Sequence, residues 1–158
     1  MLLAVGDEAP EFAATATDGR AVSLSALRGR KVVLYFYPKA FTPLCTKETI
    51  RFRDNYHDLH ALGVEVIGIS VDDPDTQCRF AERHQVRFPL LADTSKTISR
   101  AYGVLRSLLP FDRRVTYVVD EHGRIAAVFQ HEFQVSRHLD DVWWFVRRAT
   151  SPSGSPSR

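Results

Sequence analysis

The sequence predicts an α/β domain whose central mixed sheet is covered by helices on both faces. The apolar run over 31–37 is continuous, which is typical of a strand buried on both sides, and a second buried strand is expected over 64–71. Each strand is followed by a stretch with helical spacing of apolar residues. The chain then ends in two strands that form a hairpin and a last helix, so the sheet is expected to be only partly parallel.

The chain before the first long strand is expected to form a small hairpin over residues 13–24. Asp18 and Gly19 mark its turn, because glycine accepts the positive φ that tight hairpin turns require. A short helical turn over 23–29 follows, and Gly29 is a residue type that commonly ends such a turn.

Two prolines mark the starts of the longer helices. Proline has no N–H to leave unpaired, and its fixed φ suits the first helical residue, so Pro43 and Pro74 predict helices over 43–62 and 74–84. Gly63 is the stop signal of the first helix. The other expected elements are a short strand near Leu90, a helix over 95–102, strands over 115–119 and 124–129, and a helix over 136–148.

Length and composition limit the number of domains and the classes of partner that the chain can have. A chain of 158 residues with 44% hydrophobic residues fits one domain, expected over 1–150, and the Ser- and Pro-rich segment 151–158 is predicted to be a disordered tail. The 21 Lys and Arg against 19 Asp and Glu leave a net charge of +2, so neither nucleic acid nor a membrane surface is expected as a partner. Residues 1–5 are too few for a signal sequence, which favours a cytoplasmic location.

The chain has two cysteines, Cys45 and Cys78. They are too few for a disulfide framework and lack the spacing of a zinc site, so a redox or catalytic use is favoured and no metal or other cofactor is expected. His57 and His60 lie three residues apart on a predicted helix, but no third ligand is evident. They are interpreted as part of a solvated face.

Cys45 is the candidate nucleophile. With Thr42 as the N-cap and Pro43 as the first helical residue, Cys45 is the third residue of its helix. The free N–H groups and the helix dipole favour an anion there, and the thiolate is the reactive form of a cysteine. The alternative is a small buried hydrophobic side chain. The ring of Pro43 is also expected to keep water from the thiolate. The alternative is that this proline serves only as the first residue of the helix.

The segment around this cysteine also carries a resemblance. Pro38, Thr42 and Cys45 stand in the spacing Pro-x-x-x-Thr-x-x-Cys after an apolar strand, which resembles the active-site motif of the peroxiredoxins. The resemblance is to the bacterioferritin-comigratory (Q-type) branch, and it implies a thioredoxin-like fold with the hairpin as an N-terminal extension. Matching stretches follow in the order of the family at 5–10, 36–43, 68–72, 88–93 and 114–120.

The resemblance implies a thiol-dependent peroxidase that reduces hydrogen peroxide and alkyl hydroperoxides. The Cys45 thiolate would attack a peroxide oxygen and become a sulfenic acid, which a second thiol reduces. Thioredoxin or a similar thiol reductant is the implied partner, and a monomer or weak dimer is expected. The alternatives are a one-cysteine peroxidase that uses an external thiol and a non-catalytic redox sensor or holdase. A disulfide oxidoreductase is disfavoured, because Cys45 is not part of a Cys-x-x-Cys motif.

The resemblance assigns a role to one further residue, and the spacing of residues around Cys45 assigns roles to two more. The active-site arginine of the family maps onto Arg114, which leaves Arg113 as its solvated neighbour. Glu48 follows Cys45 by about one helical turn and would repel a thiolate, so it is expected to orient Arg114, with an ordinary surface carboxylate as the alternative. Thr42 is expected to cap the helix and to donate a hydrogen bond to a bound peroxide.

Cys78 is the candidate resolving cysteine, and here the sequence departs from the branch. The branch commonly has this cysteine five residues after the nucleophile, where this chain has Ile50, or at a position that aligns with Ala81. Cys78 lies about 200° around its helix from Phe80, which is expected in the core, so its sulfur should be accessible. An intramolecular disulfide with Cys45 is expected, for which the first turn around Cys45 would have to unwind.

Overall fold

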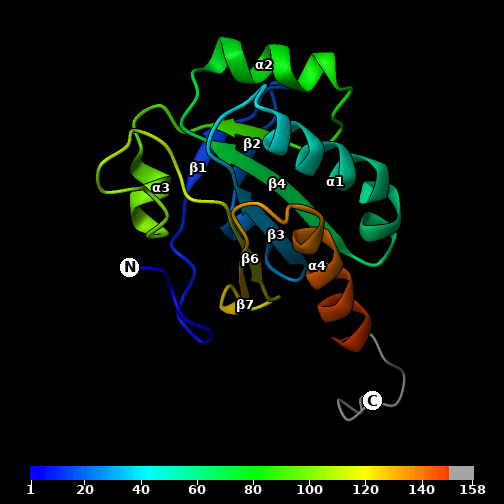
Figure 1. The fold of residues 1–158 in the computed structure, drawn as a ribbon. Helices are drawn as coiled ribbons and strands as arrows, with labels where there is room; N and C mark the ends of the chain where they lie inside the picture. Colours follow the sequence, from blue (N-terminus) through cyan, green and yellow to red (C-terminus); the bar gives the residue numbers. More distant parts are fainter. Residues whose placement is uncertain (150–158) are drawn as a thin grey trace.

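A computed structural model describes residues 1–149 and contains a five-stranded mixed sheet between layers of helices (Figure 1). The order of the strands is β5-β4-β3-β6-β7. β3, β4 and β5 are parallel, whereas β6 is antiparallel to β3 and β7 is antiparallel to β6. The expected partly parallel sheet is therefore confirmed. The strands are β3 (Lys31–Phe36), β4 (Val64–Ser70), β5 (Leu90–Ala92), β6 (Val115–Val119) and β7 (Ile125–Gln130).

Helices cover both faces of this sheet. α1 and α4 lie side by side on one face (Figure 1), and the Nε1–H of Trp143 on α4 donates to Asn55 Oδ1 on α1 at 3.2 Å. On the other face, α3 and the N-terminal segment pack over the sheet, and Phe12 and Ile98 belong to one apolar cluster with Phe36. The helices are α1 (Pro43–Ala61), α2 (Pro74–Arg83), α3 (Thr97–Ala101) and α4 (Ser136–Ala149).

The N-terminal hairpin forms where the sequence predicts it. β1 (Ala13–Thr15) pairs with β2 (Ala21–Ser23), and Gly19 in the turn between them has φ +85°. A 3₁₀ turn, η1 (Ser25–Leu27), follows. The third helix is shorter than expected, beginning at Thr97 after a left-handed Lys96, and the tail predicted over 151–158 lies outside the described residues.

The register of β6 decides which side chains reach α1. Thr116 pairs with Tyr35 in the middle of the sheet, and both face the layer of α1 and α4. Because side chains alternate along a strand, Arg114 just before β6 lies on that same face, whereas Val115 and Tyr117 pack into the opposite cluster. The β3–β6 pairing therefore sets the position of Arg114.

Gly68 allows three strands to pack closely in the middle of the sheet. A Cβ atom added at Gly68 would lie 2.6 Å from Leu90 Cδ2 and 2.7 Å from Tyr35 Cζ. Both neighbours are fully buried, so neither can move aside cheaply.

We expect Gly68→Ala to lower the free energy of unfolding by about 1–3 kcal/mol, because the added methyl group overpacks the core. Urea denaturation measures the change. In a Leu90→Ala background the same substitution should cost less, because the nearest clashing atom is gone. Equal costs in the two backgrounds would contradict this origin.

Candidate active site

Cys45 lies in the first turn of α1 and is fully buried. Pro43 is the first helical residue, and Thr42 precedes it in extended backbone, so Cys45 is the third helical residue, as the sequence predicts. Its side chain is 0% exposed and belongs to the apolar cluster between α1 and the sheet. The thiol therefore combines the first turn of a helix, which favours an anion, with a dry environment.

The side chain of Thr42 does not cap α1, contrary to the sequence-based expectation. Its hydroxyl donates instead to the carbonyl of Lys39 at 2.6 Å, while the Thr42 carbonyl accepts from the Thr46 N–H at 2.9 Å. The hydrogen bond between Thr42 and Lys39 thus joins the two ends of a tight turn in the loop before α1. Because this bond uses the hydroxyl proton, the oxygen has lone pairs with which to accept a hydrogen bond from a hydroperoxide, and it has no free proton to donate.

Asp72 holds the loop between β3 and α1. Its Oδ2 accepts from the Ala40 N–H at 2.7 Å and from the Ser70 hydroxyl at 2.7 Å. Asp72 does not cap α2, because Asp73 does so by accepting from the Thr76 N–H at 2.7 Å. The contact of Asp72 with Ala40 joins residues 32 positions apart, so no local pattern indicates it.

Pro38 and Pro43 bound this loop at its two ends. Pro38 follows Tyr37, whose N–H donates to the Ile69 carbonyl at 3.1 Å in the last hydrogen bond of this segment to β4. Because proline has no N–H, the next residue cannot continue this pairing. Pro38 is half-buried, whereas Pro43 is exposed at the start of α1. The exposed ring of Pro43 thus lies at the surface side of the turn that contains Cys45.

Arg114 contacts Cys45 directly. Its Nη2 donates to the Cys45 sulfur at 3.4 Å, its Nη1 to Glu48 Oε1 at 2.7 Å and its Nε to the Glu132 carbonyl at 2.9 Å. Arg114 is only 3% exposed, whereas Arg113 is half-buried, and alternation along the chain turns its side chain to the other side. The structure thus places Arg114, and not Arg113, against the thiol.

Charges in the site oppose the cost of burial. Burial lowers the pKa of the Arg114 guanidinium, but the negative charges of Glu48 and Cys45 outweigh it and raise that pKa. Burial also raises the pKa of the Glu48 carboxyl to about 7, against the opposing effect of Arg114. Glu48 is 1% exposed, which excludes the surface carboxylate of the alternative interpretation and agrees with a residue that orients Arg114.

His138 and Thr116 are buried polar residues that sequence reasoning missed. His138 Nδ1 and Thr116 Oγ1 are 2.8 Å apart, and His138 Nδ1 lies 3.8 Å from Glu48 Oε2. The available signal was spacing: His138 lies four residues before Val142, on the buried stripe of α4. A histidine on such a stripe needs buried hydrogen-bond partners, which local patterns do not reveal.

Cys78 lies on α2 and is exposed, as its helical position predicts. Its sulfur points toward the N-terminal hairpin, where it lies 3.6 Å from the Thr17 carbonyl. Phe80, two residues later, packs instead on Phe41 in the loop before α1, with ring centroids 5.2 Å apart. Both cysteines are free thiols, and the Cys78 sulfur contacts the hairpin, whereas the loop that leads to Cys45 contacts Phe80.

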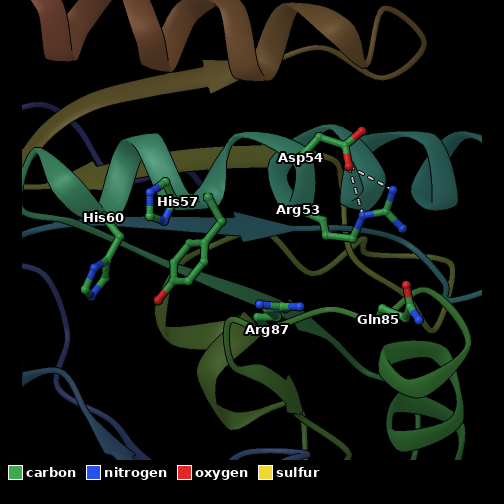
Figure 2. A pocket seen from close by; sticks show the side chains of 7 residues that line it. Arg53, Asp54, His57, His60, Gln85 and Arg87 are labelled. Carbon is green, nitrogen blue, oxygen red and sulfur yellow. Dashed lines mark hydrogen bonds and ion pairs between the residues drawn. The ribbon is translucent and has the colours of Figure 1, made fainter.

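His57 and His60 line an open cleft of about 530 Å³ between α1 and the segment before β5 (Figure 2). Both imidazoles are exposed, and Arg53 in the same cleft pairs with Asp54 at 2.8 Å. Within residues 1–149, no group of three or more His, Cys, Asp or Glu side chains is arranged to hold a metal ion. The exposure of both imidazoles agrees with a solvated face.

Comparison with known proteins identifies the family. Residues 5–128 match the AhpC/TSA family. The chain belongs to the AhpC/TSA family and is a peroxiredoxin. It is 39% identical to chloroplastic Peroxiredoxin Q of Gentiana triflora over 145 residues, which are 91% of this chain and 67% of that protein. It is also 39% identical to Peroxiredoxin Bcp of Escherichia coli (strain K12) over 146 residues, which are 89% of this chain and 93% of that protein. The resemblance to the Q-type branch is thus confirmed.

Solved structures support the same fold for this peroxiredoxin. Peroxidoxin BcpB from Mycobacterium tuberculosis superposes with a TM-score of 0.86 at 34% identity, covering 93% of this chain and 98% of that one. Peroxiredoxin Q of Xanthomonas campestris gives a TM-score of 0.79 at 25% identity, covering 86% and 89%. The thioredoxin-like fold expected from the sequence is therefore confirmed. This peroxiredoxin spans about two thirds of the chloroplastic relatives, for example 65% of the protein from Populus jackii.

We expect Arg114→Ala to slow the reaction of this peroxiredoxin with hydrogen peroxide by about 100-fold, because it removes the donor that contacts the sulfur. Arg113→Ala is the matched control, since its side chain lies on the other side of the chain, and it should change the rate less than about twofold. Stopped-flow fluorescence of the reduced protein measures both rates. Equal effects of the two substitutions would contradict this placement.

Proposed function

We propose that Cys45 is the peroxidatic cysteine of a thiol-dependent peroxidase that reduces hydrogen peroxide and alkyl hydroperoxides. The observation that carries the proposal is the 3.4 Å contact between the Cys45 sulfur and the Arg114 guanidinium in the first turn of α1. A cation and a helix N-terminus together favour the thiolate, which is the nucleophile. Membership of the AhpC/TSA family supports the same chemistry.

The reaction uses the groups around Cys45 in distinct ways. The thiolate forms a bond with one peroxide oxygen as the O–O bond breaks, so sulfur is oxidised to sulfenic acid and the other oxygen leaves as water or an alcohol after taking up a proton. Arg114 stabilises the negative charge that moves from sulfur to the leaving oxygen. Thr42 accepts a hydrogen bond from the peroxide O–H, and Pro38 and Pro43 hold the loop that presents it.

Cys78 resolves the sulfenic acid in this proposal by forming an intramolecular disulfide with Cys45. The exposure of the Cys78 thiol supports the proposal. The direction of its side chain adds a requirement, because the sulfur faces Thr17 and the loop before α1 contacts Phe80 instead. Both the first turn of α1 and the helix α2 must therefore rearrange before the two sulfurs meet. The alternative is reduction of Cys45 by an external thiol.

Thioredoxin or a similar dithiol protein is the proposed reductant of the resulting disulfide. The peroxiredoxin itself is proposed to be a monomer or a weak dimer. The cytoplasmic location expected from the sequence stays a prediction. Among the described residues 1–149, no helix is long and apolar enough to cross a membrane.

We expect Cys45→Ser to abolish peroxide reduction, because a serine hydroxyl is not ionised near neutral pH and cannot replace the thiolate. A coupled assay with peroxide, thioredoxin, thioredoxin reductase and NADPH measures turnover. The fold should persist, since one oxygen replaces one sulfur, and circular dichroism checks it. Turnover in this variant at the wild-type rate would refute the assignment of Cys45, whereas no turnover in the wild-type protein would favour the alternative of a redox sensor or holdase.

One equivalent of peroxide added to the reduced protein should give a disulfide between Cys45 and Cys78, detected by peptide mass spectrometry. Cys78→Ser should instead leave Cys45 as a sulfenic acid, which dimedone labels, and slow turnover with thioredoxin by at least about tenfold. Ser107→Ala, at an exposed position in the loop between α3 and β6, is a control for a neutral surface change. A Cys78→Ser variant with normal turnover would show that an external thiol resolves Cys45.

A further inference from the structure

Behind Arg114, two ionisable side chains are buried against each other. Glu48 on α1 is 1% exposed and His138 on α4 is 0% exposed. Glu48 Oε1 accepts from Arg114, but Glu48 Oε2 has no hydrogen-bond partner, and the nearest ring nitrogen, His138 Nδ1, lies 3.8 Å away. A buried carboxylate oxygen without a donor is rare in folded proteins and indicates a position where a proton is expected.

The hydrogen bonds of His138 fix its tautomer. His138 Nε2 lies 2.8 Å from the His131 carbonyl, which can only accept, so Nε2 carries a proton. In the neutral ring Nδ1 is then an acceptor, and the Thr116 hydroxyl at 2.8 Å donates to it. Two acceptors, Nδ1 and Glu48 Oε2, therefore face each other with no donor between them.

Burial favours the uncharged form of each group. The pair carries one negative charge when Glu48 is ionised, and it becomes neutral by taking up one proton. Burial raises the pKa of Glu48 to about 7 and lowers that of His138 to about 4, so each group resists its own charged form. The other charged or titratable groups that act on the pair lie on several elements. They are Tyr35 on β3, Cys45 on α1, Arg114 before β6, His131 and Glu132 after β7, and Asp141 on α4.

We propose that Glu48 and His138 form a proton-holding pair, which takes up one proton when Cys45 loses its thiol proton. Cys45 and Glu48 both contact the guanidinium of Arg114, so a new negative charge on the sulfur raises the affinity of the pair for a proton. Once the pair is protonated, the charge of Arg114 is no longer shared with a Glu48 carboxylate. The guanidinium then stabilises the thiolate alone.

This step balances the peroxidase reaction. The thiolate sulfur forms a bond to one oxygen of the hydroperoxide and is oxidised by two electrons, while the O–O bond breaks and the leaving oxygen takes one proton. The sulfenic acid is uncharged, so the pair then loses its extra proton. The proton that left the thiol is thus matched by the one that the leaving oxygen requires. His138 is a positioning residue in this scheme, because it touches neither sulfur nor peroxide.

The first test counts protons in the unmutated site. In a Cys78→Ser background, Cys45 is the sole thiol, and iodoacetamide converts its thiolate to a neutral thioether without releasing a proton from sulfur. At pH 7.5 to 8, above the pKa of about 7 that burial gives the Glu48 carboxyl, we expect release of more than about half a proton per cysteine, read with an indicator dye. Release of about 0.1 proton or less throughout, the amount expected from residual thiol, would overturn the proposal.

The second test shifts the pair in both directions. His138→Gln keeps a donor for the His131 carbonyl but removes the Nδ1 acceptor, so Glu48 keeps its charge. The midpoint of the alkylation rate against pH should rise by about one unit, and proton release should be lost. Thr116→Val removes the donor to Nδ1, so the pair should bind its proton more tightly and the midpoint should fall. His57→Gln, an exposed histidine on α1, is the control and should change neither.

Shifts of the same sign in the two variants, or none, would overturn the proposal. If His138→Gln does not fold, Thr116→Val and the proton count still decide it. The proposal rests on Cys45 as the reacting cysteine, but both experiments follow alkylation and not turnover. A loss of peroxidase activity in Cys45→Ser therefore tests the proposed function, whereas the proton count tests the pair.

Discussion

The burial of the Arg114 guanidinium is the constraint on which the site depends. A buried cation is costly unless every N–H has a partner, and the partners of Arg114 come from separate parts of the chain: Cys45 and Glu48 on α1, and Glu132 after β7. α1, β6 and the end of β7 must all be in place before these bonds form. A slip of one residue in the β3–β6 pairing would turn Arg114 to the other face of the sheet and leave the thiol without its cation.

The loop before α1, like the Arg114 guanidinium, is held by contacts with separate parts of the chain. The Ala40 N–H is bound by Asp72, the Thr42 hydroxyl by Lys39, and the ring of Phe41 lies on α2. These contacts hold the first turn of α1 against β4 and α2, so Cys45 has a defined position relative to Arg114 before any substrate arrives. Such preorganisation matters because donors that must reorient during the reaction stabilise its charge less.

Features with local causes could be predicted from the sequence. Pro43 and Gly63 mark the start and end of α1, and the apolar run over 115–119 coincides with β6. The placement of Arg114 needed a resemblance in addition to alternation along the strand. The roles of Asp72 and His138 were missed, because their partners lie 32 and 22 residues away and no periodicity records such contacts. The Thr42 hydroxyl has two possible hydrogen-bond partners nearby, a backbone N–H in the first turn of α1 and the Lys39 carbonyl. The geometry of the loop selects the Lys39 carbonyl.

Phe41 joins the two segments that contain the cysteines. Its φ of +69° is left-handed, a conformation that costs a non-glycine residue about 1–3 kcal/mol, and its contact with Phe80 on α2 helps to maintain it. If α2 detached, that contact would be lost and the loop could relax, so we expect α2 and the first turn of α1 to open together. Their amide protons would then exchange with solvent through a shared opening event. Access of a second thiol to Cys45 would therefore depend on how often α2 opens.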